Sequence, residues 1–218
     1  MYVLNGTKEL KPGQTWIDDN GVQHPGNWAS VWSNDVKASY GIKEVAIQAK
    51  PDNKFYRVGQ RNLDGSWTSK EKNLEDVIQT NDDGEKFTTL GLKSQWIAQT
   101  KETANSLLAP TDWQVIAKAE RDRAIDSDVA TYRAAVITAC TAIEKAITDI
   151  TDTAIPSDLA TIQAKDEKDK TDADKKVVAD YEAEVATKFA AFKKLFDVPV
   201  DSNGKPTGNP PMHDWPEK

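Results

Sequence analysis

The sequence predicts an α+β protein with a small hairpin-rich N-terminal domain, an α-helical region of bundle or coiled-coil character, and an extended C-terminal arm. Three observations predict it. Turn pairs such as Asn-Gly and Asp-Gly alternate with short β-branched or aromatic runs up to Gly91. Alanine becomes abundant from Leu92, and five prolines occur between Val198 and Lys218. We therefore expect domains at 1–91, 92–197 and 198–218.

The N-terminal domain is expected to consist of hairpins and one short helix. Its turns are predicted at Asn5-Gly6, Pro12-Gly13, Asn20-Gly21, Pro25-Gly26, Asp64-Gly65 and Asp83-Gly84. The strands between them are predicted at Tyr2–Leu4, Gln14–Ile17, Val45–Gln48, Phe55–Val58 and Trp67–Thr68. Ser33–Tyr40 is predicted to be the helix, ended by Gly41 at the position that favours glycine.

Three helices are predicted between residues 92 and 150. Apolar residues at helical spacing indicate a first helix over Leu92–Ala109, which Pro110 ends. Asp112 is expected to cap a short second helix, and Asp126 or Ser127 a longer third one. In the third helix, Val129, Val136, Ile143 and Ile150 are seven residues apart, with Tyr132, Ala139 and Ala146 between them. This spacing indicates a seam that fits either an oligomeric coiled coil or a helical hairpin within one chain.

The last helix is predicted to begin at Ser157 and to contain an aromatic stripe formed by Tyr181, Val185, Phe189, Phe192 and Phe196. The intervening segment 165–176 has no apolar stripe, so it is expected to be a solvated helical tip or a flexible joint. Prolines forbid a helix or a central strand in 198–218. We expect this segment to be an arm whose Trp215 docks on another surface.

Charge and composition exclude several functional classes. The chain has 28 basic and 35 acidic residues, a net charge of −7, so nucleic acid is not expected as a partner. Residues 1–95 hold 12 basic and 13 acidic groups, so most of the excess acidity lies in the helical region. The sequence has no run of about 18 apolar residues, and we expect no membrane insertion. With one cysteine, the chain cannot form an internal disulfide.

No motif indicates catalysis, a metal or a cofactor, and we expect a protein that is not an enzyme. The two histidines, His24 and His213, lie far apart in turn-rich segments, and no Gly-x-Ser-x-Gly elbow accompanies them. Cys140 lies in an apolar-facing run and is expected to be a packed core residue. Two Asp-x-Asn-Gly segments, 18–21 and 201–204, match only part of a calcium loop and are interpreted as turns. A glycan-cleaving enzyme would need a recognisable pair of carboxylates, which is missing.

Four stretches, in this order, carry a family resemblance. They are Phe55-Tyr56-x-Val58 with Asp64-Gly65-Ser66-Trp67, Leu92-Lys93-x-x-Trp96-Ile97-Ala98-Gln99-x-Lys101, Leu107-Leu108-Ala109-Pro110-Thr111-Asp112-Trp113, and Val129-Ala130-x-Tyr132-Arg133-Ala134-Ala135-Val136. The chain resembles, over roughly residues 50–150, bacteriophage tail proteins of the tail-fibre assembly or tail assembly chaperone-like family. Within the shared motif, we expect Thr111 or Asp112 to cap a helix and Trp113 to pack back near Trp96 and Leu107.

The resemblance implies a virion protein of the tail, baseplate or fibre-attachment region that acts through protein–protein contacts. Its partners would be other phage tail or fibre proteins and further copies of itself, for instance in a trimer, and it would pass through the host cytoplasm during assembly. The alternative is a transient tail-fibre assembly chaperone that leaves the finished particle. The large apolar side chains of an otherwise hydrophilic chain are the candidate partner-binding residues: Trp16, Trp28, Trp32, Tyr181, Phe189, Phe192 and Trp215.

Overall fold

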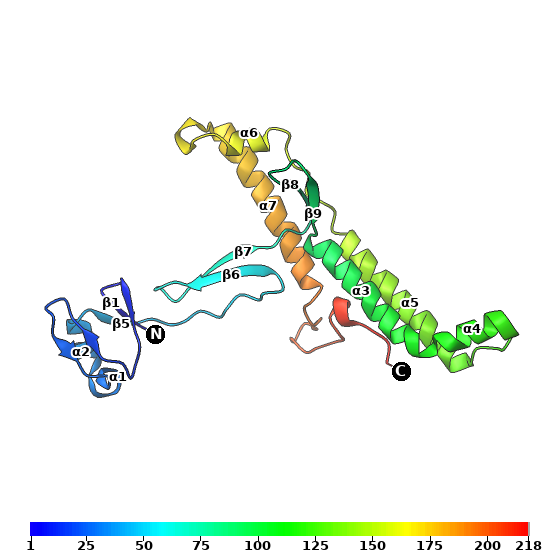
Figure 1. The fold of residues 1–218 in the computed structure, drawn as a ribbon, viewed down its shortest axis with the longest axis horizontal. Helices are drawn as coiled ribbons and strands as arrows, with labels where there is room; N and C mark the ends of the chain where they lie inside the picture. The colour runs from blue at the N-terminus through cyan, green and yellow to red at the C-terminus, as the bar shows by residue number, and fades with distance from the viewer. Residues whose placement is uncertain (218) are drawn as a thin grey trace. The chain divides into compact units, whose positions relative to one another are not determined.

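The computed structural model describes residues 1–217, so that Lys218, the last residue of the predicted arm, lies outside the described residues. The chain divides into two compact units, Met1–Lys72 and Asn73–Lys218. Small hairpin sheets make up the first unit and helices dominate the second, which agrees with the predicted α+β class (Figure 1).

A three-stranded antiparallel sheet organises the first unit. Strand β1 (Tyr2–Leu4) lies between β2 (Lys8–Leu10) and β5 (Ile42–Glu44). The β1–β2 turn is the predicted Asn5-Gly6 pair, with φ of 48° and 71° at the two residues. Both residues therefore occupy the left-handed region that this tight hairpin turn requires.

Two further hairpins and two short helices complete the first unit. The hairpins are β3 (Trp16–Ile17) with β4 (Gln23–His24), and β6 (Tyr56–Arg61) with β7 (Trp67–Glu71). The helices are α1 (Trp28–Val31) and α2 (Asn34–Ser39). The prediction of α2 is confirmed, because the Ser33 hydroxyl accepts a hydrogen bond from the Val36 amide and Gly41 follows with a φ of 73°.

The fifth strand lies closer to α2 than the sequence predicted. We expected a strand at Val45–Gln48, but β5 covers Ile42–Glu44, where Ile42 pairs with Leu4. Pairing begins directly after Gly41 because the Gly41 carbonyl already accepts a hydrogen bond from the Asn5 amide at 2.9 Å. The alternation of Val45–Gln48 could not reveal this long-range register.

The core of the first unit is aromatic. Trp28 is fully buried, Trp16 is 5% exposed, and both pack with Leu4, Leu10 and Ile42. The indole Nε1 of Trp28 donates to the Gln14 carbonyl at 3.2 Å, which gives this buried polar group a partner. Few but very large side chains thus supply the buried surface of a unit whose strands are only two to six residues long.

The second unit begins with a hairpin that the sequence composition assigns to the predicted N-terminal domain, 1–91. It consists of β8 (Val77–Thr80) and β9 (Lys86–Thr89), joined at Gly84. The segment before β8 crosses the start of the first long helix, where the Leu92 amide donates to the Asn73 carbonyl and the Gly91 amide to the Asp76 carboxylate. Gly91 is required there, because a Cβ would come within 2.3 Å of the Leu74 carbonyl oxygen.

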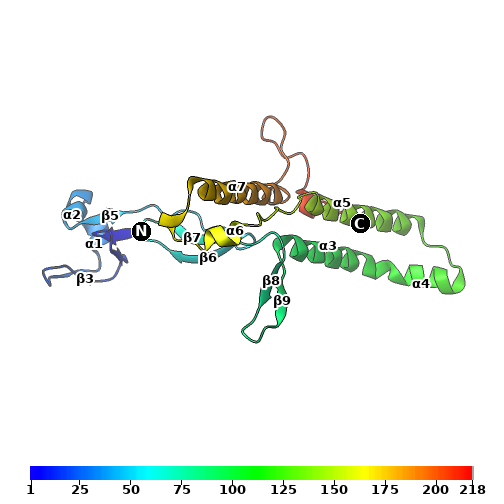
Figure 2. The same cartoon turned by 90° about the horizontal axis from the view of Figure 1, so that it is seen from above.

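Two antiparallel helices form the centre of this unit. They are α3 (Leu92–Leu108) and α5 (Ser127–Thr148), which run side by side in Figures 1 and 2. The buried residues are Leu92, Thr100 and Ala104 on α3 and Val136, Ile143 and Ile147 on α5. Part of the predicted heptad seam is therefore buried within one chain. Between α3 and α5 lie a 3-10 turn (Ala109–Thr111) and α4 (Asp112–Arg121).

The predicted last helix is split into two. Helix α6 (Leu159–Gln163) is short, and α7 (Asp172–Lys194) begins inside the charged segment. A capping box starts α7: the Thr171 hydroxyl accepts from the Asp174 amide and the Asp174 carboxylate accepts from the Thr171 amide. Bonds from Lys165 and from the Thr171 amide lower the pKa of Asp174 to about 2. The charged segment thus defines a helix start as well as a connection.

The C-terminal arm folds back on its own unit. Val200 pairs with Pro206 around the Asn203-Gly204 turn, and a 3-10 turn follows at Pro211–His213. Met212 is 4% exposed, and its amide donates to the Leu195 carbonyl at 3.0 Å. The arm lacks helix and central strand as predicted, but it is folded rather than extended.

In the described part of the chain, no helix combines the length and the apolar character needed to cross a membrane.

Replacing Thr171 by Ala is expected to lower the free energy of unfolding of the helical unit by about 1 kcal/mol, because the α7 start loses the acceptor of its capping box. Urea unfolding followed by circular dichroism would measure this. The matched control is Thr187→Ala, an exposed mid-helix site of α7 whose hydroxyl bonds only to the preceding turn. Equal losses in both variants would contradict a capping role.

Candidate functional site

The predicted partner-binding residues of the first unit lie mainly inside it. Trp16 and Trp28 are buried, and Trp32 is half-buried against Tyr40, with the two rings stacked at 4.8 Å. Direct contact of Trp16 or Trp28 with a partner would require this core to open. Partner contact stays a prediction for Trp32, whose ring is partly accessible.

The predicted partner-binding residues of the second unit also include both buried and partly accessible side chains. Phe189 and Phe192 are 2% and 0% exposed, whereas Tyr181 and Trp215 are half-buried. Phe196, from the same stripe, packs against Trp96 with ring centroids 4.6 Å apart. The C-terminal part of the stripe, Phe189 to Phe196, therefore packs inside the unit. Tyr181, at the N-terminal end of the stripe, stays partly accessible.

Trp215 lies at a groove on α5. This groove of about 630 Å³ is lined by small side chains of α5 and by the arm: Ala135, Thr138, Ala139, Ala142, Ile143, Ala146, Asn209, Pro211, Asp214, Trp215 and Pro216. Small residues let the arm approach the helix axis closely, and the half-buried indole gives it a large apolar contact. The predicted docking of Trp215 thus has a surface within its own chain.

The motif that carries the family resemblance forms one bracket around Arg133. Its guanidinium Nη1 donates to the Leu108 carbonyl, the Thr111 hydroxyl and the Asp112 carboxylate at 2.9, 2.7 and 2.8 Å. Neither Thr111 nor Asp112 provides the predicted side-chain cap, because both side chains face Arg133 instead. The bracket joins the end of α3 and the start of α4 to α5.

A second contact holds the same first turn of α4. The Gln114 amide nitrogen donates to the Asp126 carboxylate at 2.8 Å, and the Asp126 amide donates back to the Gln114 oxygen at 2.9 Å. Gln114 is 7% exposed, so this reciprocal pair satisfies a buried amide. It also fixes which face of α4 is directed outward.

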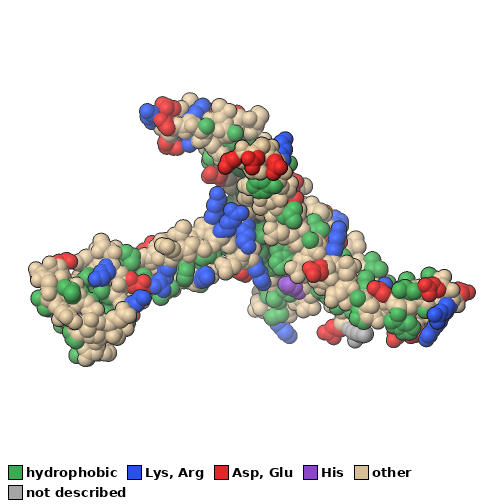
Figure 3. All heavy atoms as spheres, in the orientation of Figure 1, with side chains coloured by type: hydrophobic (Ala, Val, Ile, Leu, Met, Phe, Trp, Pro, Cys, Tyr) green, Lys and Arg blue, Asp and Glu red, His purple; other side chains and the backbone are tan. Residues whose placement is uncertain are grey.

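Three large apolar side chains of α4 are exposed, among charged ones such as Lys118 and Glu120. Trp113, Val115 and Ile116 are 50%, 39% and 55% exposed, and the Arg123 guanidinium lies 5.3 Å from the Trp113 ring centre. The expectation that Trp113 packs near Trp96 and Leu107 is wrong. Gln114 occupies the inward position of the helix, and the adjacent Trp113 therefore points in another direction, toward the surface. Hydrophobic side chains are visible at the surface of this end in Figure 3, between acidic and basic ones. Trp113 and Ile116 are three residues apart and therefore neighbours on one side of the helix, and we call these two residues the α4 face.

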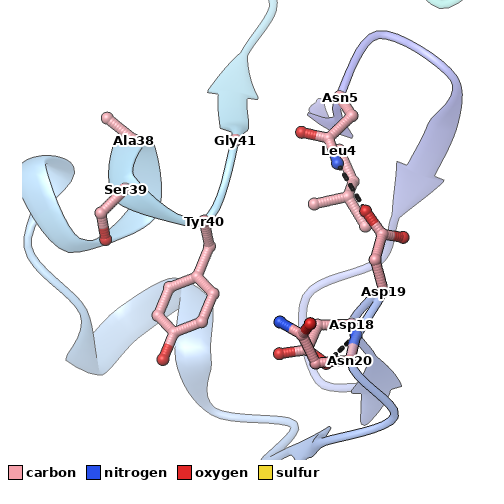
Figure 4. Close-up of a pocket in the computed structure, with 9 residues that line it drawn as sticks. All are labelled: Leu4, Asn5, Asp18, Asp19, Asn20, Ala38, Ser39, Tyr40 and Gly41. Atoms are coloured by element: carbon pink, nitrogen blue, oxygen red, sulfur yellow. Dashed lines mark hydrogen bonds between the residues drawn. The ribbon is translucent and has the colours of Figure 1, made fainter.

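The first unit contains a polar cleft of about 470 Å³. One wall comes from two turns, with Asn5, Asp18, Asp19 and Asn20, and the other is Tyr40 at the end of α2 (Figure 4). Leu4, Ala38, Ser39 and Gly41 complete the lining. In Figure 4, Asp18 and Asn20 point across the cleft toward the Tyr40 side.

Hydrogen bonds fix the first wall. Asp18 Oδ1 accepts from the Asn20 and Val22 amides, each at 2.9 Å, and Asp18 Oδ2 lies 3.1 Å from His24 Nε2. The bond from the Val22 amide and the contact with His24 lower the pKa of Asp18 below its ordinary value. His24 is itself enclosed by Trp16, Trp32 and Tyr40, so the aromatic core positions the turn.

Cys140 is half-buried beside α3 rather than a core residue. Its thiol donates to Glu144 Oε1 at 3.2 Å, and burial together with Glu144 raises the pKa of the thiol. A raised pKa reduces the thiolate fraction that a nucleophile needs. Among residues 1–217, no three His, Cys, Asp or Glu side chains are grouped so that they could hold a metal ion.

The chain was compared with protein-family models, with curated protein sequences and with solved structures, and none of them matches it.

Replacing Arg133 by Ala is expected to lower the free energy of unfolding by about 2 kcal/mol, because three acceptors lose a charged, mostly buried donor. Chemical denaturation would measure this. The control is Lys145→Ala, which removes an exposed ion pair with Asp149 within α5 and should cost less than about 0.5 kcal/mol. A loss at Arg133 no larger than the control would show that the bracket contributes nothing to stability.

Replacing Trp215 by Ala is expected to speed hydrogen exchange at the Met212 amide, because the arm loses its largest contact with α5 and the bond to Leu195 opens more often. Exchange followed by NMR would measure this. Trp113→Ala is the matched control, since its ring is exposed on α4 and should leave Met212 unchanged. Unchanged protection in the Trp215 variant would show that the indole does not hold the arm.

Proposed function

We propose that the protein is a structural component of a phage particle, in the tail, baseplate or fibre-attachment region, and that it acts through protein–protein contacts. The observation that carries the proposal is the α4 face. The residues of the tail-protein resemblance, Thr111, Asp112 and Arg133, make the bracket that holds α4 with Trp113 and Ile116 exposed. In this chain the residues that carry the resemblance thus have a mechanical role, which supports a protein that offers a helix to a partner.

The physical case for a contact surface rests on exposure and rigidity together. Trp113 is an exposed tryptophan, a residue type enriched at interface hot spots, and the exposed Ile116 is its neighbour three residues along the helix. Because the Arg133 bracket and the Gln114–Asp126 pair anchor the first turn of α4, where Trp113 lies, less conformational entropy would be lost there when a partner binds. We propose that the partner is another tail or fibre protein.

Self-association belongs to the same proposal. The α5 seam is already partly used against α3, so a homo-oligomer such as a trimer would have to use other surfaces, with the α4 face and the accessible end of the α7 stripe near Tyr181 as candidates. Sedimentation at several concentrations separates an oligomer from a monomer.

Quantitative mass spectrometry of purified particles tests the function. A structural component should be present in mature virions in a fixed ratio to other tail proteins, and Trp113→Ser with Ile116→Ser should reduce its incorporation while leaving the fold, monitored by circular dichroism, intact. The matched control is Ile137→Ser, an exposed aliphatic position on α5.

Absence of the chain from mature particles would reject the structural role. If the absent chain also raises the yield of folded fibre on coexpression, it is instead a transient assembly chaperone. Incorporation that the α4 variants leave unchanged would remove the α4 face from the proposal.

A further inference from the structure

We propose that the polar cleft of the first unit, between the turn 18–21 and Tyr40, binds a neutral saccharide. The proposal does not depend on the function proposed above. It rests on the cleft's volume, on the groups that line it and on which of those groups are already bonded.

The cleft has the size and construction of a small-ligand site. Its volume of about 470 Å³ lies within the roughly 300–1,000 Å³ typical of such sites. Polar side chains line one wall, and an aromatic ring forms the other (Figure 4). Both walls are held rigidly, one by the bonds of Asp18 and the other by the stacking of Tyr40 on Trp32.

The charges of the lining exclude anionic ligands. Asp18 and Asp19 bring two carboxylates, and no lysine or arginine is among the lining residues. A phosphate or carboxylate group placed between them would meet repulsion without a compensating cation. A ligand of this cleft must therefore be neutral or cationic.

The bonding of the carboxylates disfavours a bare cation. Both oxygens of Asp18 are engaged, Oδ1 by two backbone amides and Oδ2 by His24, and Asp19 Oδ2 accepts from the Asn5 side-chain nitrogen Nδ2 at 3.2 Å. A hard cation such as calcium takes six to eight oxygen ligands. Too few oxygens remain here to supply that number.

The remaining groups suit hydroxyls. Among the described residues, neither the Asn20 side-chain amide, Asp19 Oδ1 nor the Tyr40 hydroxyl has a hydrogen-bond partner. Together they offer acceptors and donors at short range, as the alternating hydroxyls of a sugar need. Tyr40 is 39% exposed, and one face of its ring is covered by Trp32, so its contribution to the cleft is the hydroxyl and the exposed part of the ring.

A second copy of the same turn supplies the control. In the turn 201–204, the amides of Asn203 and Lys205 bond Asp201 Oδ1 at 2.8 and 2.9 Å, as Asn20 and Val22 bond Asp18. The two turns share their local structure, yet Asn203 lies in the other unit and does not line this cleft. Asn203→Ala therefore imitates Asn20→Ala in everything except the proposed site.

The test is an NMR titration of the full chain with glucose, galactose, mannose and N-acetylglucosamine, followed at the backbone amides. At least one sugar should shift the amides of 18–20 and 39–41 in a saturable way. Asn20→Ala and Ser39→Gln, the first removing a hydrogen-bonding group and the second filling the cleft, should each weaken binding about tenfold or more. Asn203→Ala should bind like the unmodified chain.

Three outcomes would overturn the proposal. The first is that none of the four sugars produces saturable shifts, and the second is that calcium chloride shifts these amides while the sugars do not. The third is an equal loss of binding in Asn20→Ala and Asn203→Ala. The amide spectrum of each variant without sugar shows whether the variant is folded. If Asn20→Ala disturbs the turn, the proposal is judged on Ser39→Gln instead. Particle composition is measured separately, so the failure of either proposal leaves the other standing.

Discussion

The antiparallel packing of α3 against α5 is the interaction on which the helical unit depends. The two helices contain the buried residues Leu92, Thr100, Ala104, Val136, Ile143 and Ile147, and their packing brings distant parts of the sequence into contact at both ends. At one end, Lys93 reaches the Ile150 carbonyl and the Asp152 carboxylate, and at the other Arg133 reaches the end of α3. Each of these cations lies on one helix of the pair and bonds groups at or beyond the end of the other, so the pair fixes where the connecting segments leave it. The position of α4 and the groove for the arm both follow from this arrangement.

Local patterns in the sequence predicted the elements well, and long-range contacts account for what they missed. Helix α3, helix α2 with Ser33 and Gly41, and the Asn5-Gly6 turn follow from capping, turn chemistry and periodicity, all of which act over a few residues. The position of β5 is set by pairing with Leu4, some 40 residues away in sequence. Nothing within Ile42–Gln48 itself carries that information.

The same distinction applies to the candidate sites. Large aromatic residues were predicted to bind partners, but size alone does not separate Trp28, which is fully buried, from Trp113, which is half exposed. What distinguishes an exposed tryptophan from a buried one here is its position on the helix relative to a polar residue that has a buried hydrogen-bond partner. Gln114 bonds Asp126 inside the fold, so its neighbour Trp113 must face another direction. Polar cleft residues such as Asn20 were interpreted as a plain turn, because the Tyr40 wall that completes the cleft comes from a separate element.

The low apolar content of the chain acquires a physical meaning from these placements. In the first unit, a few indole rings supply the buried apolar surface that many aliphatic side chains would otherwise provide. Their packing around His24 also holds the turn that forms one wall of the cleft. In the helical unit, alanines on α5 take the place of larger residues and leave room for the arm instead of a third full helix. Other large apolar side chains, such as Ile78, Phe87 and Ile137, are also exposed, and α4 differs in carrying three exposed ones within four residues, Trp113, Val115 and Ile116. Exposing them on a helix that is anchored at its first turn is costly for an isolated protein, because exposed apolar surface promotes association, and is reasonable for one that a partner covers.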